Sequence, residues 1–393
     1  MSGKPSPITP SVLAWAIAED GRPPVEIAEA LKIDEAVLDE WAEGESQPTV
    51  GQVTDLGKTL KRPRAMFFMP QPPISASLPP SFRHPPGDDR QVSATARRKV
   101  RQARQVQTVI AEALADRDPL DVPRFVLATP ADEAAAAARR WLGVNDTTQA
   151  SWRNDHEALN AWRTALDYRG IFVFALEIGD PGQRKTMRTT QSVSDEVRGF
   201  SAWDDRAPLI VMNSRRVSAA ARCFTLGHEL GHLVARVDAA CIDTQVDTQF
   251  GEPIERWCEE FGAALLMPEE PTRLFARARG LTDDSGDIED VKALMNAFRV
   301  SGRAAALRLI DLGLAPRSLY RTVVAMFRPK PTVEGRTTGW SPPRSQMRLR
   351  QFGPRALDAV FRDVEPFEAL SILRMTVPDA RELSGQVPSA AVL

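Results

Sequence analysis

The chain has 393 residues, of which 43% are hydrophobic and 26% are charged, and its formal net charge is -2. This length is too great for one hydrophobic core, so we expect two or three domains. The balanced charge excludes a protein that coats nucleic acid or a membrane through bulk electrostatics. No apolar run approaches the roughly 18 residues that span a bilayer, and the amino terminus leads into no signal-type segment.

The cysteines indicate a reducing compartment. There are three of them, Cys223, Cys241 and Cys258, and no two form a Cys-x-x-Cys pair. An odd number without that spacing does not suggest a disulfide framework. We therefore expect a cytoplasmic protein.

Residues 1–70 are predicted to form an all-α helix-turn-helix bundle. The apolar pattern indicates helices starting at about Val12, over 25–31, from Glu35 to Trp41 or a little beyond, and over 49–60, with Asp34 and Thr49 as candidate N-caps. Short helices joined by tight turns are typical of such bundles. The expected architecture of the whole chain is α+β, with this bundle preceding a mainly helical domain that has a small β-sheet.

The charge of this first domain does not favour DNA. Residues 1–60 hold four lysines and arginines against eleven acids, and the segment 34–45 has acids but no lysine or arginine. A recognition helix needs cations near phosphates and polar groups at base edges. We therefore favour a protein-interaction role, and DNA binding stays the second interpretation.

Residues 71–124 are predicted to be a Pro-rich linker followed by a basic helix over about 92–115. Proline favours extended, semi-rigid chain. Three interpretations of the basic helix stay open: a solvated face, a surface that pairs with the acidic first domain, or a nucleic-acid contact. Its cations lie in the segment 90–104, at Arg90, Arg97, Arg98, Lys99, Arg101 and Arg104.

The main domain is expected over residues 125–327. Helices are predicted over 131–142, 157–167, 218–237 and 254–268, with further helix within 291–314. Strands are predicted over 170–176, 197–203 and 208–213. Residues 328–393 are predicted to be a loop, to about 345, and a small helical unit whose role the sequence does not indicate.

The most informative motif is His228-Glu229-Leu230-Gly231-His232, inside the predicted helix 218–237. Residues four apart point nearly the same way from a helix, so the two imidazoles can bind one metal ion with Glu229 beside them. In zinc peptidases such a Glu takes a proton from water. Gly227 and Gly231 each cost about 1 kcal/mol relative to Ala in a helix interior. A backbone or a substrate that passes close to the helix would explain them.

A catalytic zinc ion usually has three protein ligands, so one more is needed. The predicted helix 254–268 supplies Glu255, Glu259 and Glu260. Periodicity places Glu255 and Glu259 on one face and does not choose between them. Cys258 is a further candidate, although a His-His-Cys set is a less common solution for a hydrolase.

The HELGH motif, followed by Glu255-x-x-Cys258-x-x-Phe261 and an Ala-Ala-Leu-Leu-Met-Pro helix end, resembles the ImmA/IrrE (DUF955) metallopeptidases of bacteria. The lead-in from Arg222 to Gly227 is also similar. This resemblance implies Zn²⁺ held by His228, His232 and Glu255, with Glu229 as general base in a zincin-like domain. The family usually has Asn where this chain has Glu259, so Glu259 is the alternative ligand or a group that bonds to a ligand from outside, a role also open to Arg222.

Residues 41–49 resemble the Xre/Cro-type domains that often precede such peptidases. Together the resemblances imply a zinc endopeptidase that cleaves a specific regulatory protein, of repressor or antitoxin type, in transcriptional control, stress response or phage defence. The alternative is a non-catalytic regulator or interaction module that the metal stabilises. Glu229 favours the enzyme, because a closed structural zinc site has no need of that carboxylate.

Overall fold

A computed structural model describes residues 5–20, 22–72, 94–178, 197–214, 217–236, 239–242, 253–327 and 342–392, with 239–242 as backbone. These residues fall into two compact units. The first contains residues 5–72 of this set and 94–101, and the second contains the described residues from 102 onward. Each unit is described by itself.

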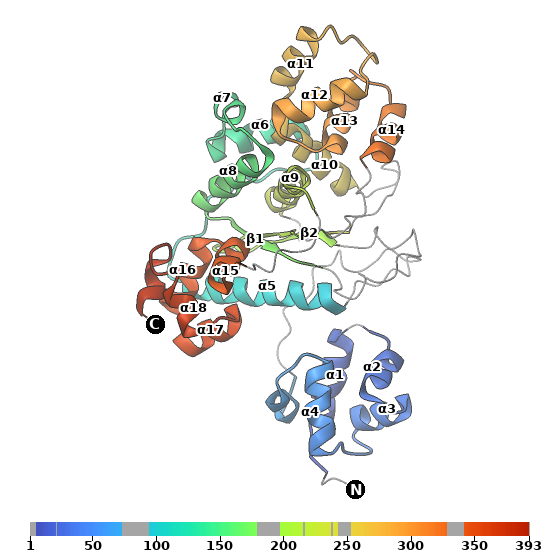
Figure 1. The fold of residues 1–393 in the computed structure, drawn as a ribbon, viewed down its shortest axis with the longest axis vertical. Coiled ribbons are helices and arrows are strands. Elements are labelled where there is room, and N and C mark those ends of the chain that lie inside the picture. Colours follow the sequence, from blue (N-terminus) through green and yellow to red (C-terminus); the bar gives the residue numbers. More distant parts are fainter. Residues whose placement is uncertain are drawn as a thin grey trace. The chain divides into compact units, whose positions relative to one another are not determined.

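The first unit is all-helical, as predicted. Its core consists of apolar side chains from every helix, including Leu13, Leu38, Trp41 and Leu56. The Thr49 side chain accepts a hydrogen bond from the Gln52 amide in a reciprocal capping box, as its cap position predicted. Asp34 occupies the N-cap position but its side chain makes no capping hydrogen bond. The elements, drawn in blue in Figure 1, are α1 (Pro10–Asp20), α2 (Pro24–Leu31), α3 (Glu35–Glu43), α4 (Val50–Thr59) and a 3₁₀ turn (Arg64–Phe68).

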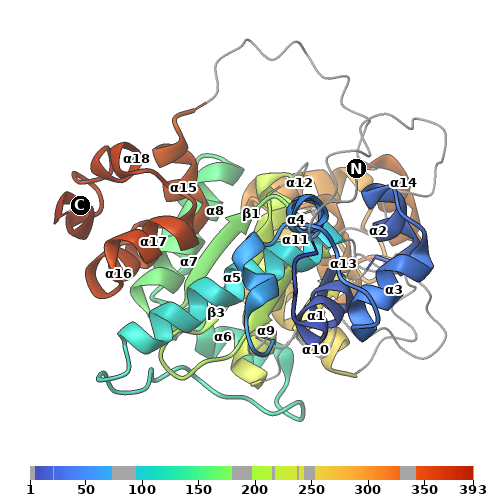
Figure 2. The same ribbon diagram turned by 90° about the horizontal axis from the view of Figure 1, so that it is seen from below.

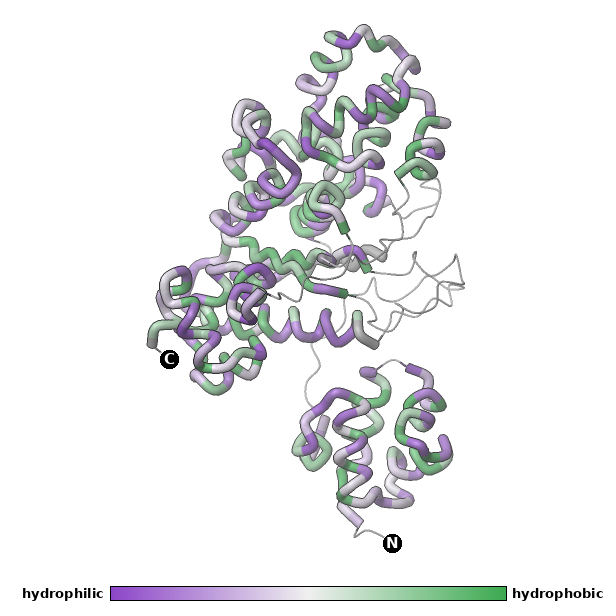
Figure 3. The backbone as a smooth tube through the Cα atoms, in the orientation of Figure 1, coloured by the Kyte–Doolittle hydropathy of each residue, from purple (hydrophilic) through white to green (hydrophobic). Residues whose placement is uncertain are grey.

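The second unit is built on a four-stranded sheet in the order β1-β3-β2-β4. β1 (Phe172–Leu176) runs parallel to β3 (Leu209–Asn213), while β2 (Val197–Ala202) is antiparallel to both β3 and β4 (Ala239–Ile242). β1 and β3 are buried along their whole length, and β1 is hydrophobic throughout in Figure 3. Residues buried on both faces of a sheet read as continuous apolar runs, which is why the sequence indicated these strands.

Helices cover both faces of this sheet (Figure 1). On one face, Val173, Ile210 and Met212 share a core with apolar residues of α9 (Ala219–Ala235). On the other, α5 (Ala94–Ala113) lies across the strands in the view of Figure 2, and its Gln107 amide donates to the carbonyls of Ala202 and Ala207.

The described part of the main domain contains eight further helices. They are α6 (Ala131–Leu142), α7 (Asp146–Ala150), α8 (Asp155–Tyr168), α10 (Pro253–Leu266), α11 (Glu269–Ala278), α12 (Ile288–Phe298), α13 (Gly302–Asp311) and α14 (Ser318–Met326). α10 packs against both α9 and α6. The predicted helices and the first three strands are thus present, whereas β4, α7, α11 and α14 were not predicted. The predicted helical zone 291–314 consists of α12 and α13.

The carboxyl-terminal part is a set of short helices, as predicted. It contains α15 (Arg344–Phe352), α16 (Pro354–Asp363), α17 (Pro366–Leu373), α18 (Val377–Arg381) and a 3₁₀ turn (Pro388–Val392). α15 packs on β1, where Phe352 meets Phe174 edge-on at 5.0 Å between ring centroids. Most of the predicted linker 71–124 before α5, and the predicted loop from 328, lie outside the described residues. Among the described helices, none has the length and apolar character that a bilayer crossing requires.

Candidate metal centre

Helix α9 carries four buried polar side chains, those of Thr225, His228, Glu229 and His232. Ser218 caps its start by accepting from the Ala221 amide, and Arg236 ends it in the left-handed conformation. His232 and Glu229 are fully buried and His228 is 7% exposed. The Nε2 atoms of His228 and His232 lie 3.1 Å apart, because residues four apart lie one above the other on a helix.

Helix α10 brings a carboxylate to these two nitrogens. Glu255 places Oε2 3.3 Å from Nε2 of His228 and Oε1 3.4 Å from Nε2 of His232. Two ligands bound to one zinc ion at tetrahedral angles lie about 3.3 Å apart, given metal–ligand distances of about 2.0–2.1 Å. The three donor separations therefore fit a tetrahedral divalent cation, and neutral imidazole with carboxylate is a donor set that zinc accepts. Within the described residues, His228, His232 and Glu255 are the group found to meet the requirements for a metal site.

Glycines let α9 and α10 approach closely enough for Glu255 to reach the two imidazoles. A Cβ at Gly227 would lie 3.2 Å from the Cα of Gly262, and one at Gly262 would lie 3.0 Å from the amide nitrogen of His228. A Cβ at Gly231 would lie 3.1–3.2 Å from Cys258. These separations are shorter than ordinary carbon contacts of about 3.5–4.0 Å. A passing backbone, one of the two explanations that the sequence left open, thus accounts for both glycines of the HELGH region.

Strand β2 supplies the surface beneath Glu229. A Cβ at Gly199 would lie 3.1 Å from Glu229 Oε1 and 2.6 Å from the Thr225 methyl group. The absence of a side chain at Gly199 is therefore what leaves room for the carboxylate between α9 and the sheet. This fourth glycine belongs to the site, and the sequence gives no signal for it, because the sequence does not show which strand residue faces α9.

Burial and charge act in opposite directions on these groups. Burial alone would lower the pKa of His228, but its hydrogen bond with Glu255 and the charges of Glu229, Glu255 and Glu259 raise the pKa overall. Burial would raise the pKa of Glu255, and its hydrogen bonds with His228 and His232 outweigh that effect and lower the pKa well below its usual value. Both shifts are in the directions that favour a charged imidazole beside a charged carboxylate.

The other predicted site residues lie around this cluster. Glu259 is close enough to feel the charge of His228, and burial raises its pKa, but it is not among the three clustered donors. Cys258 is buried, and burial followed by the neighbouring carboxylates raises the pKa of its thiol strongly, which disfavours the thiolate that a metal would need. Arg222 lies six residues before His228 on α9, about 9 Å along the helix axis, and its possible role beside the ligands stays a prediction.

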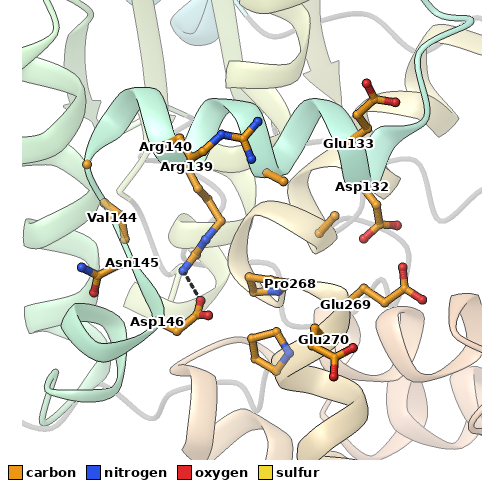
Figure 4. A pocket seen from close by; sticks show the side chains of 14 residues that line it. Asp132, Glu133, Arg139, Arg140, Val144, Asn145, Asp146, Pro268, Glu269 and Glu270 are labelled. Carbon is orange, nitrogen blue, oxygen red and sulfur yellow. Dashed lines mark hydrogen bonds and ion pairs between the residues drawn. The ribbon is translucent and has the colours of Figure 1, made fainter.

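A separate pocket of about 670 Å³ lies between α6 and the start of α11 (Figure 4). Asp132, Glu133, Glu269 and Glu270 gather at one end, and Arg139 enters it from α6 with an ion pair to Asp146 at 2.8 Å. None of the three donor residues lines it. This pocket lies at the carboxyl-terminal end of α10 and is separate from the metal centre.

A His-Glu-x-x-His helix joined by a distant Glu has the residue pattern of metal-dependent peptidases. Residues 168–309 match the family model Peptidase_M78, described as the IrrE N-terminal-like domain. The match runs from the end of α8 into α13 and includes the four strands, α9 and α10. It supports the family to which the motifs pointed, over that part of the chain. Among curated proteins, none matches the chain.

Proposed function

We propose that the chain is a zinc-dependent cytoplasmic endopeptidase that cleaves a specific regulatory protein of repressor or antitoxin type. The observation that carries the proposal is the convergence of His228, His232 and Glu255 to separations of 3.1–3.4 Å beside a buried Glu229. The match of residues 168–309 to a peptidase family model supports the same activity. Residues 1–60, with eleven acids against four lysines and arginines, and the helical architecture of residues 10–68 are consistent with an Xre/Cro-type domain that binds a protein partner.

The roles of the chain's own residues follow from their positions. His228, His232 and Glu255 would hold the ion, which when bound supplies Lewis-acid chemistry that polarises a carbonyl and acidifies water. Glu229 sits beside the donors and is suited to accept a proton from water and pass it to the leaving nitrogen. Glu229 is fully buried, and its Oε1 lies where a Cβ at Gly199 would come within 3.1 Å, so the glycine leaves room for this carboxylate beside the donors.

Glu229→Gln tests the proposed base. This variant should keep its zinc and lose at least a hundredfold in cleavage of a co-encoded regulator, since general bases typically contribute 10²–10⁴. Glu270→Gln, at an exposed position of α11, is the matched control and should cleave normally. Retained proteolysis by the Glu229→Gln variant would show that Glu229 is not the general base. Full zinc binding with no proteolysis in the wild type, across co-encoded regulators, would favour the alternative of a non-catalytic regulator.

A pair of variants on α10 tests the third ligand. Glu255→Ala should lose zinc, measured by bound metal after dialysis, while Glu259→Ala, one turn further along the same helix, should retain it. The reverse result would transfer the ligand role to Glu259.

A further inference from the structure

The carboxyl-terminal helices contain a turn with a specific backbone pattern. The eight-residue helix α17 ends at Arg374, which has the left-handed φ of 53°. Met375 follows and is buried, and Thr376 then caps α18 in a reciprocal box with Asp379. Three residues thus join two helices, the first left-handed and the last an N-cap, which is the connection found in helix-turn-helix motifs.

The first unit repeats this pattern residue by residue. The eight-residue α2 ends at Lys32 with φ 59°, Ile33 packs on the core, and Asp34 is the N-cap residue of α3. Four buried positions also correspond when Pro366 is placed on Pro24, although Ile372 and Leu373 are buried where Ala30 and Leu31 are not. Buried Ala369, Leu370, Ala380 and Leu383 then occupy the places of buried Ile27, Ala28, Leu38 and Trp41.

The two motifs differ in charge where a helix-turn-helix meets DNA, at the start and outer face of its second helix. In the first unit these positions are Asp34, Glu35, Asp39 and Glu40, which would repel phosphate. Their counterparts in the carboxyl-terminal motif are Thr376, Val377, Arg381 and Glu382, so three of the four acids are absent.

Arginines gather around this second turn. The guanidinium of Arg348 donates from Nη2 to the carbonyl of Arg374 at 3.4 Å, which places α15 beside the turn. Arg344 is half-exposed, and its Nη1 lies 3.9 Å from Oδ2 of Asp379. Burial, and then the positive charges of Arg374 and Arg344, lower the pKa of Arg348, whereas the charge of Asp379 raises it, so the three cations lie close enough to repel one another with one acid among them. An anionic partner would relieve this repulsion.

We propose that the α17–turn–α18 motif, together with Arg344, Arg348 and Arg374, is a contact surface for the phosphate backbone of duplex DNA. Duplex DNA fits better than an acidic protein because the cations border a helix-turn-helix connection, a motif that binds duplex DNA. The contact is independent of the metal centre and of peptidase activity.

The test is binding of the full chain to a fluorescein-labelled duplex of about 20 base pairs with random sequence. Fluorescence anisotropy measures this binding at salt concentrations from 50 to 200 mM. The variant with Arg344, Arg348 and Arg374 all changed to Gln should bind at least tenfold more weakly at 50 mM salt. Its slope of log affinity against log salt should also be smaller by about 2 to 3, since each phosphate contact contributes about 0.9. Arg277→Gln, at an exposed position of α11, is the control and should behave as wild type.

Arg374→Gly is a second variant that removes one charge without straining the turn, because glycine adopts a positive φ readily. It should lower the slope by about 1. No binding by the wild type at 50 mM salt would overturn the proposal, as would equal binding by the wild type and the triple variant. Capture of polyglutamate in place of the duplex would assign the surface to an acidic protein and would also overturn it.

Discussion

The crossing of α9 and α10 can be perturbed at a single atom by Gly231→Ala. The added Cβ would lie 3.1 Å from Cys258 Sγ and 3.2 Å from both the Cα and the Cβ of Cys258. Carbon atoms in ordinary contact are about 3.5–4.0 Å apart, so the two helices must separate by roughly 0.3–0.5 Å. Because two of these contacts involve the Cα and Cβ of Cys258, rotating its side chain does not relieve them.

This separation should act on the metal centre. Cys258 lies three residues after Glu255 on the same face of α10, so both move together. The distances of 3.3 and 3.4 Å from Glu255 to the two imidazoles would widen to about 3.7 Å, beyond the roughly 3.3 Å of a tetrahedral zinc site. We expect zinc affinity to fall about 10- to 100-fold, the range seen when groups that position ligands are altered.

Competition with a chromophoric chelator measures that affinity, and melting of the metal-free protein measures stability separately. Alanine improves helix propensity by about 1 kcal/mol, which offsets part of the roughly 1–3 kcal/mol typical of overpacking. The control is Gly51→Ala in α4, where the nearest atom would be Thr49 Oγ1 at 3.9 Å, and zinc affinity should not change. Zinc affinity of Gly231→Ala within twofold of wild type would refute the argument that this crossing sets the donor geometry.

Three further predictions concern the buried polar groups. In the metal-free protein, the raised pKa of His228 stabilises the folded state fully below pH 6.5, and this stabilisation is lost as the pH rises through the folded pKa. The lowered pKa of Glu255 stabilises the folded state above pH 4.5, and this stabilisation is lost as the pH falls through the folded pKa. Thermal melting in the presence of a chelator should therefore show the largest stabilisation by this pair between pH 4.5 and 6.5. Zinc affinity should instead rise with pH above that window, because the imidazole must lose its proton to bind the metal. If metal-free stability and zinc affinity rose and fell together with pH, the prediction would be contradicted. Burial raises the pKa of the Cys223 thiol to about 12 and that of Cys258 further, so mass-spectrometric mapping at pH 8 should find neither alkylated in the folded protein, and rapid labelling of either would disprove their burial. Asn213→Ala should lower the free energy of unfolding by about 3 kcal/mol in denaturant titrations, because three buried backbone groups lose the hydrogen bonds of that amide; a loss below 1 kcal/mol would show that they find other partners.

The local sequence pattern was sufficient to predict an element where that element has a strong hydrophobic period or a clear capping residue. The apolar run at 170–176 became β1, and Thr49 formed the cap that its position indicated. The HELGH spacing alone placed two imidazoles on one side of α9. It could not choose between Glu255 and Glu259, because both lie on the same face of α10. Distances between α9 and α10 distinguish them, and such distances depend on packing across the chain.

Elements that form only through contacts with other parts of the chain were not predicted from the sequence. The four-residue strand β4 pairs with β2, and little in Ala239–Ile242 marks a strand without that neighbour. The correspondence between α17–α18 and α2–α3 was likewise not recognised. Its left-handed residue is Arg in one motif and Lys in the other, rather than the Gly that commonly marks this conformation. The backbone pattern is shared while the sequence marker is absent.

The metal centre depends as much on small residues as on its donors. His228 and His232 are fixed by one helix, but Glu255 reaches them only because Gly227 and Gly262 face each other where α9 crosses α10. A chain with the same His-Glu-x-x-His motif and a larger residue at the position of Gly262 would push the backbone of His228 away from α10. Its two imidazoles would remain in place without a third ligand. The pair of glycines on different helices therefore indicates a complete three-donor site more specifically than the five-residue motif does by itself.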